Sequence, residues 1–81
     1  MRIEQLLTEA FQPEVLEVRD DSAKHHGHAG WRPGGGTHMH VSIRAAALAG
    51  LGRVEAHRRI NAVLAEEFAA GLHALEIRIS R

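Results

Sequence analysis

The sequence predicts a single α+β domain in which two helices cover one face of a three-stranded mixed sheet. A chain of 81 residues is long enough for one domain, residues 1–81. Two segments place apolar residues at helical spacing, and three segments alternate apolar with polar residues, as half-buried strands do. The predicted order is helix, strand, strand, short helical turn, helix, strand. The economical packing puts both helices on the apolar face of the sheet.

The first helix is expected over residues 1–11. Its apolar residues fall on one helical face: Ile3, Leu6, Leu7, Ala10 and Phe11. Pro13 ends this helix, because the residue before a proline avoids helical geometry.

Two strands are expected to follow, over residues 14–20 and from His38 to Arg44. Leu16 and Val18 mark the apolar side of the first strand. The apolar side of the second strand carries Met39, Val41 and Ile43, and His38 and His40 lie on its other side. The loop between the strands, residues 21–37, is too rich in glycine to form a crossover helix. The two strands are therefore predicted to pair antiparallel.

The second half of the chain predicts a short helical turn within residues 45–52 and a main helix over residues 53–70. His57, Leu64 and Phe68 are expected at the centre of the apolar face of this helix, with His57 as a hydrogen-bonded buried residue. Glu55 is expected to pair with Arg59 on its solvent side.

Gly71 provides a stop for the main helix, and residues 74–81 alternate as a third strand. Leu75, Ile77 and Ile79 are its inward residues. Because a helix connects it to the second strand, these two strands are predicted to be parallel, with a right-handed connection.

Composition excludes several classes of protein. The chain has no cysteine, so it has no disulfides and no thiolate metal site. Its first residues carry two glutamates and no long apolar run, and no stretch approaches the ~18 apolar residues of a membrane span. We expect a cytoplasmic protein without a membrane segment. We expect no enzymatic activity and no small-molecule substrate, because no nucleophile–base pair or pair of carboxylates stands out.

The segment from His25 to His40, HHGHAGWRPGGGTHMH, holds five of the seven histidines. Without cysteine, imidazole is the only soft metal ligand in the chain, so we expect function on this loop. Trp31 is either an interface anchor or a cover for the sheet edge. The run Gly34–Gly36 is not a phosphate loop, because no Lys-Ser/Thr pair follows it, and it is expected to supply flexibility.

Five blocks in order resemble the BolA family: DDSAKH from Asp20, GTHMHVSI from Gly36, VEAHRR from Val54, LAEEF from Leu64 and GLHALEI from Gly71. The resemblance covers nearly the whole chain. It implies a fold similar to class II KH domains and a role in iron homeostasis. It also implies a monothiol glutaredoxin as partner, with which the protein shares a 2Fe-2S cluster.

The resemblance also implies the ligands of that cluster. The glutaredoxin supplies a cysteine and holds glutathione, whose thiol is another ligand. The HAL triplet places one histidine ligand of this chain at His73, and the DxSxxH pattern places the other at His25. His28 is the reserve for the second position, and His26 is a further alternative. Read without the family, His73 could instead cap the end of a helix.

Two other functions stay open on the sequence alone. A nucleic-acid-binding regulator of transcription could use Arg44, Arg53, Arg58 and Arg59 on phosphates. The net charge of zero and residues 50–53, which read GLGR where KH domains have GxxG, speak against DNA binding. A stand-alone metal-binding protein is the third reading. For a partner or nucleic-acid surface the candidates are Trp31, His38, Arg53 and Arg58; for His38, a structural role is the other expectation.

Overall fold

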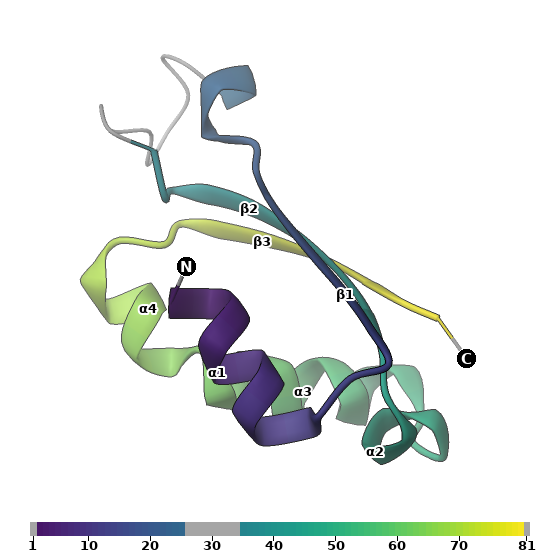
Figure 1. Cartoon of the computed structure of the whole chain (residues 1–81). Helices are drawn as coiled ribbons and strands as arrows, with labels where there is room; N and C mark the ends of the chain where they lie inside the picture. Colours follow the sequence, from purple (N-terminus) through teal and green to yellow (C-terminus); the bar gives the residue numbers. More distant parts are fainter. Residues whose placement is uncertain (1, 26–34, 81) are drawn as a thin grey trace.

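A three-stranded sheet forms one layer of the molecule, and the helices all lie on one of its faces (Figure 1). The computed structural model describes residues 2–25 and 35–80. Its elements are α1 (Arg2–Phe11), β1 (Val15–Asp20), the 3₁₀ turn η1 (Ser22–His25), β2 (His38–Arg44), α2 (Ala46–Ala49), α3 (Arg53–Val63), α4 (Ala65–Ala70) and β3 (Ala74–Ile79). The predicted α+β class and order of elements are confirmed.

Strand β2 is the centre of the sheet, in the order β1-β2-β3. It pairs antiparallel with β1, with Leu16 opposite Ile43, and parallel with β3, with Val41 opposite Ile77. Both predicted pairings are confirmed. The parallel pair places the beginning of β3 beside the beginning of β2, at the end of the sheet where the loop after β1 returns.

The hydrophobic core fills the space between the helices and the sheet. Every second residue of β2 points toward the helices, as its alternation predicts, and these are Met39, Val41 and Ile43. The buried apolar residues are Ile3, Leu7, Met39, Val41, Ile43, Ala45, Leu48, Ala56, Ile60, Leu64 and Leu72. Every helix except α4 adds a residue to this core, and the strands β1 and β3 pack half-buried side chains at its margin.

The single main helix predicted over residues 53–70 is wrong, because the helix breaks at Leu64 into α3 and α4. Leu64 has φ −99° and ψ 12°, outside helical geometry, although its N–H still donates to the carbonyl of Ile60 at 3.1 Å. The prediction that His57 is buried at the centre of the apolar face is also wrong, because His57 is only half-buried, beside the buried stripe of the helix. The buried stripe runs through Ala56, Ile60 and Leu64, each four residues from the next.

Other predicted features of the helices are confirmed. Helix α1 ends at Phe11, with Gln12 in the left-handed region (φ 47°) just before Pro13. Gly71 ends α4 with φ 133°, a conformation that glycine adopts at low cost. The Glu55 carboxylate accepts a hydrogen bond from Arg59 at 3.1 Å.

Candidate metal-ligand site

His73 lies at the junction between α4 and β3, with its side chain exposed. Its backbone N–H donates to the carbonyl oxygen of Thr37 at 2.8 Å, and the N–H of Ala74 donates to the same oxygen at 3.0 Å. Because the backbone is bonded to Thr37, the residue just before β2, the imidazole lies at a defined place at the end of the sheet.

The two ends of the loop after β1 are joined by a set of hydrogen bonds that we call the loop clasp, made by Asp20, Ser22, Gly36, Thr37 and His38. The hydroxyl oxygen of Ser22, which is 2% exposed, accepts from the N–H of Thr37 at 3.0 Å and from that of His38 at 3.1 Å. Thr37 therefore bonds the loop through its N–H and the His73 segment through its carbonyl. One residue connects the two segments that carry the predicted ligands.

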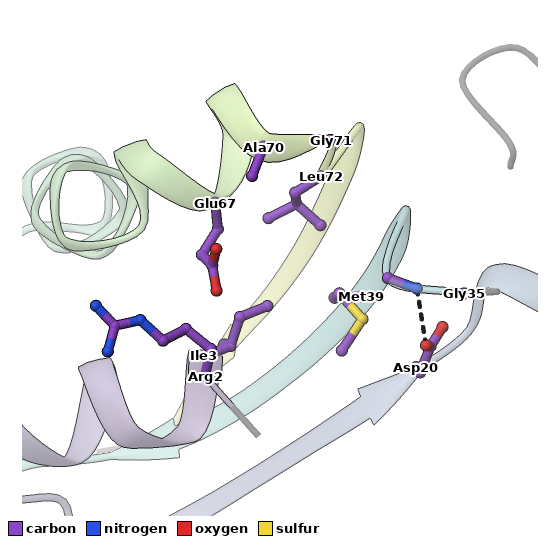
Figure 2. A pocket seen from close by; sticks show the side chains of 10 residues that line it. Arg2, Ile3, Asp20, Gly35, Met39, Glu67, Ala70, Gly71 and Leu72 are labelled. Carbon is purple, nitrogen blue, oxygen red and sulfur yellow. Dashed lines mark hydrogen bonds between the residues drawn. The ribbon is translucent and has the colours of Figure 1, made fainter.

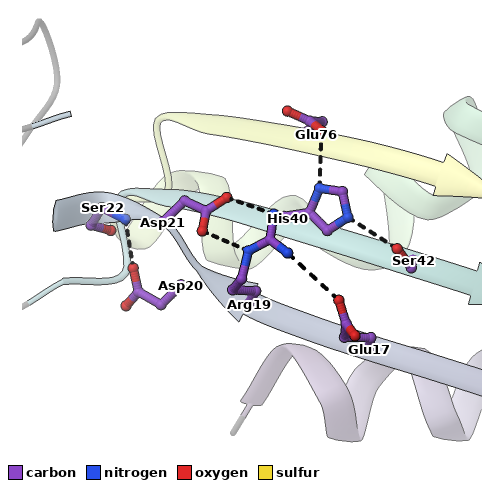
Figure 3. A network of polar contacts seen from close by, with 8 residues as sticks. All are labelled: Glu17, Arg19, Asp20, Asp21, Ser22, His40, Ser42 and Glu76. Carbon is purple, nitrogen blue, oxygen red and sulfur yellow. Dashed lines mark hydrogen bonds and ion pairs between the residues drawn. The ribbon is translucent and has the colours of Figure 1, made fainter. Parts of the chain in front are cut away.

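Asp20 completes the loop clasp. Its Oδ1 accepts from the N–H of Ser22 and its Oδ2 from the N–H of Gly36, both at 2.9 Å (Figures 2 and 3). Hydrogen bonds from the side chain and then the backbone of Ser22, with that of Gly36, hold the pKa of Asp20 below its ordinary value. The clasp therefore uses Asp20 in its ionised form.

The lowered pKa of Asp20 predicts an acid-sensitive clasp. Its stabilising effect is complete above the unfolded-state pKa of about 3.9 and is lost as the pH falls through the lower folded-state pKa. Asp20→Asn should lower the free energy of unfolding by on the order of 1 kcal/mol at pH 7, since Asp20 is exposed. Urea denaturation at several pH values measures this difference, which should shrink as the pH falls below the ordinary aspartate pKa of about 3.9.

The control for this experiment is Glu9→Gln, which removes the same charge from the exposed surface of α1. Its difference from the wild type should be small. A difference between Asp20→Asn and the wild type that stays constant from pH 7 to pH 2 would show that the carboxylate of Asp20 does not stabilise the clasp.

Gly35 and Gly36 form a turn at the end of the loop, and Gly34, the first residue of the run expected to supply flexibility, lies outside the described residues. Both have positive φ angles, 81° and 77°, and they lead directly into Thr37. A Cβ added at Gly35 would lie 2.6 Å from Oδ2 of Asp20, whereas one added at Gly36 would meet nothing within 4 Å. Gly35 and Asp20 face each other at the edge of a cavity of about 360 Å³ between α1, α4 and this turn (Figure 2).

Gly35→Ala is expected to lower the free energy of unfolding by about 2–3 kcal/mol, because it combines a strained φ with a clash against Asp20. Gly36→Ala should cost about 1–2 kcal/mol, the strain alone. Gly50→Ala is the matched control, since Gly50 has φ −90° and open space around it. Urea denaturation ranks the three variants. Equal stabilities for Gly35→Ala and Gly50→Ala would contradict the turn described here.

The other predicted site residues are described only in part. His25 is the last residue of η1, three residues after the clasped Ser22. His26, His28 and Trp31 lie outside the described residues. His38, for which a structural role or a place at the rim of a partner surface was expected, is only 6% exposed. Its ring lies against that of His73, with 5.5 Å between the centroids.

The open face of the sheet, opposite the helices, carries a polar network around His40 (Figure 3). Nδ1 of His40 lies 3.0 Å from Oε1 of Glu76, and its Nε2 lies 3.0 Å from the hydroxyl of Ser42. His40 is buried because β2 is the central strand, so side chains from its neighbours cover it. His40 is thus fully engaged within the sheet.

A groove of about 520 Å³ lies between α3 and β3. Arg53 and His57 line it from the helix, and Glu76, Ile77, Arg78 and Ile79 line it from the strand. Arg58, the other helical candidate for a nucleic-acid surface, is exposed and does not line this groove.

Sequence reasoning missed Ser22 and Thr37 as the residues that build the site. The signal that could have found them is the turn chemistry of Asp20-Asp21-Ser22, in which short polar side chains bond nearby backbone groups. In residues 2–25 and 35–80, no group of three or more His, Asp or Glu side chains is placed to hold a metal ion. None of the helices in these ranges is long and apolar enough to cross a membrane.

The family model for BolA-like proteins matches residues 7–80. An uncharacterised Sinorhizobium protein, encoded in the cobS 5′ region, is 50% identical over 76 residues, which cover 93% of this chain and 82% of that protein. Human BolA-like protein 1 is 43% identical over 72 residues, or 89% of this chain. The match spans 50% of the human protein's own length.

Solved structures match the fold as well. The BolA domain of SufE1 from Arabidopsis thaliana superposes with a TM-score of 0.88 at 39% identity, covering 99% of this chain and 87% of that one. BolA1 from the same plant gives a TM-score of 0.85 at 34% identity, with 98% and 86% covered. The architecture described above is therefore that of solved BolA domains.

Proposed function

This chain belongs to the BolA family, and from that premise we propose that it is a non-enzymatic adaptor in iron–sulfur cluster assembly and trafficking. It would share a 2Fe-2S cluster with a monothiol glutaredoxin, as part of iron homeostasis in the cytoplasm. The observation that carries the proposal is His73: an exposed histidine whose backbone is bonded through Thr37 to the loop that carries the other predicted ligands.

The residues of this chain fit a shared cluster better than one bound by this chain alone. Iron–sulfur clusters are usually held by four cysteine thiolates, and this chain has none. A partner that brings its own cysteine and the thiol of glutathione needs only nitrogen ligands from this protein. His73 is the first of these, and His25 is the second, with His28 in reserve. The cluster would supply electron-transfer chemistry, and neutral imidazole ligands raise its reduction potential relative to thiolates.

The chain itself would perform the binding and orienting. The loop clasp fixes the position of Ser22, after which the loop begins. The carbonyl of Thr37 fixes the backbone position of His73. Since both segments bond to the same residue, the partner meets two histidine-bearing segments at one end of the sheet. The exposed position of His73 leaves its ring accessible to a protein that approaches from this end.

The proposal is tested by co-expressing the protein with a monothiol glutaredoxin and glutathione, and purifying the complex without oxygen. We expect a 1:1 complex whose visible absorption and circular dichroism differ from those of the glutaredoxin homodimer. Single variants His25→Ala, His26→Ala and His28→Ala then identify the second ligand, because only its loss changes the spectrum. If no mixed complex forms, the adaptor function is wrong for this chain.

The groove between α3 and β3 favours a second candidate function, the binding of single-stranded nucleic acid. Arg53 lines it from α3 and Arg78 lines it from β3, together with Glu76, Ile77 and Ile79, and arginines along a groove are groups that bind a nucleic-acid backbone. Gel-shift titration with a single-stranded oligonucleotide at several salt concentrations tests it. Arg53→Ala should weaken binding and reduce the salt slope by about 1, whereas the control Arg58→Ala should not. No shift at low salt would exclude this function.

A further inference from the structure

We infer that His38 is a positioning residue for His73: its buried ring is the wall against which the exposed imidazole of His73 packs. The inference rests on the proposed function, in which His73 is a ligand. It extends that function to a residue that is not itself a ligand. Three sets of contacts carry it: those that fix His38, those that fix the backbone of His73, and the contact between the two rings.

The ring of His38 is fixed in place. It is 6% exposed, and its Nδ1 lies 2.9 Å from the hydroxyl of Thr37, a fully buried residue. Both backbone polar groups of His38, its N–H and its carbonyl, make hydrogen bonds. Its N–H donates to the hydroxyl of Ser22 at 3.1 Å, and its carbonyl accepts from the N–H of Asp21 at 2.8 Å. A side chain with a buried ring and a doubly bonded backbone offers a rigid surface.

The backbone of His73 is equally well fixed, but its side chain extends into solvent. Leu72 before it is buried in the core, and the N–H of His73 donates to Thr37. The rings of His73 and His38 lie with centroids 5.5 Å apart and planes tilted by 54°, a geometry typical of paired aromatic rings. An exposed histidine has two free side-chain torsions, so this contact is what restricts the direction of its ring nitrogens.

Orientation of a ligand matters because residues around a metal ligand set how well it binds, and their loss typically weakens metal binding by roughly 10- to 100-fold. Most such residues act through a hydrogen bond to the ligand. Here the flat ring of His38 orients the ring of His73, so a phenylalanine at position 38, which has a flat ring without nitrogen, should orient it as well. This distinguishes positioning from ligation, since a ligand cannot be replaced by phenylalanine.

The test compares His38→Ala and His38→Phe with the control His40→Ala, a buried histidine two residues along the same face of β2. The first measurement uses the free protein without iron or partner. The ¹H–¹³C NMR signals and relaxation of the His73 ring should change in His38→Ala, which frees the ring. They should keep wild-type relaxation in His38→Phe and stay unchanged in His40→Ala.

The second measurement uses the complex with glutaredoxin. His38→Ala should change its circular dichroism and lose the cluster to a chelator about tenfold faster than the wild type, whereas His38→Phe should restore the wild-type rate. If His38→Ala does not fold, His38→Leu, which fills the site without a flat ring, takes its place.

Two results would overturn the inference. One is a His73 ring that keeps its wild-type signals and relaxation in His38→Ala. The other is a complex in which His38→Phe behaves like His38→Ala, since this would make His38 a ligand or a nitrogen donor instead. Because the first measurement needs no cluster, the inference can stand or fail whether or not the mixed complex forms.

Discussion

His73→Ala should abolish the mixed cluster with glutaredoxin and leave the protein folded. The side chain of His73 is exposed, so its removal should change the free energy of unfolding by no more than about 0.5 kcal/mol. The backbone hydrogen bond to Thr37 is kept in the variant. Visible absorption and circular dichroism after anaerobic co-purification measure the cluster, and a thermal melt of the free protein measures the fold.

His57→Ala is the control for this experiment. His57 is half-buried in α3 and lies in the groove beside β3, away from the loop clasp. The variant should form the mixed complex as the wild type does. A His73→Ala protein that gives the wild-type spectrum would remove His73 from the ligand set, and a His57→Ala protein that loses the cluster would show that the loss is not specific.

Leu64→Ala should be among the most destabilising single substitutions in the chain. Leu64 is 0% exposed and fills the core at the point where α3 gives way to α4. Removing a buried leucine side chain costs about 2–5 kcal/mol, since the lost burial is added to a cavity. Roughly 4–12 kcal/mol is the total expected for a domain of this length. The variant should therefore lose a large share of its stability, which urea denaturation measures as a lower midpoint with an unchanged slope.

Val54→Ala is the matched control, because Val54 lies in α3, which ends just before Leu64, and is 63% exposed. Its free energy of unfolding should lie within about 0.5 kcal/mol of the wild type. If Leu64→Ala were as stable as Val54→Ala, the assignment of Leu64 to the core would be wrong.

Most of the fold could be predicted from the sequence, because alternation in the strands and the glycines and prolines at element ends are local signals. The pairing of β1 with β2 followed from the composition of the loop, and that of β2 with β3 from the intervening helix. The break at Leu64 could not be predicted. Nothing in the local sequence forbids a continuous helix there, and the error displaced the predicted apolar face onto His57.

The site could be predicted only as far as single residues. The stop at Gly71 and the alternation from residue 74 predicted His73 at a helix–strand junction, which the structure confirms. The contact between His38 and His73 could not be predicted, because it depends on the register of a parallel strand pair. The bond between Asp20 and the turn at Gly35 and Gly36 could not be predicted, since a glycine run does not reveal that a carboxylate 16 residues before Gly36 will bond to it.

The parallel pairing of β2 with β3 has a consequence for how the protein folds. The paired residues are 36 positions apart along the chain, as His40 and Glu76 are. Contacts between distant residues form slowly, because the entropy of closing the intervening segment must be lost before they form. The hairpin of β1 and β2 can form early, whereas His73 meets Thr37 only when the last strand docks. On a ribosome, the predicted ligand site is therefore completed only after β3 has been synthesised and has paired with β2.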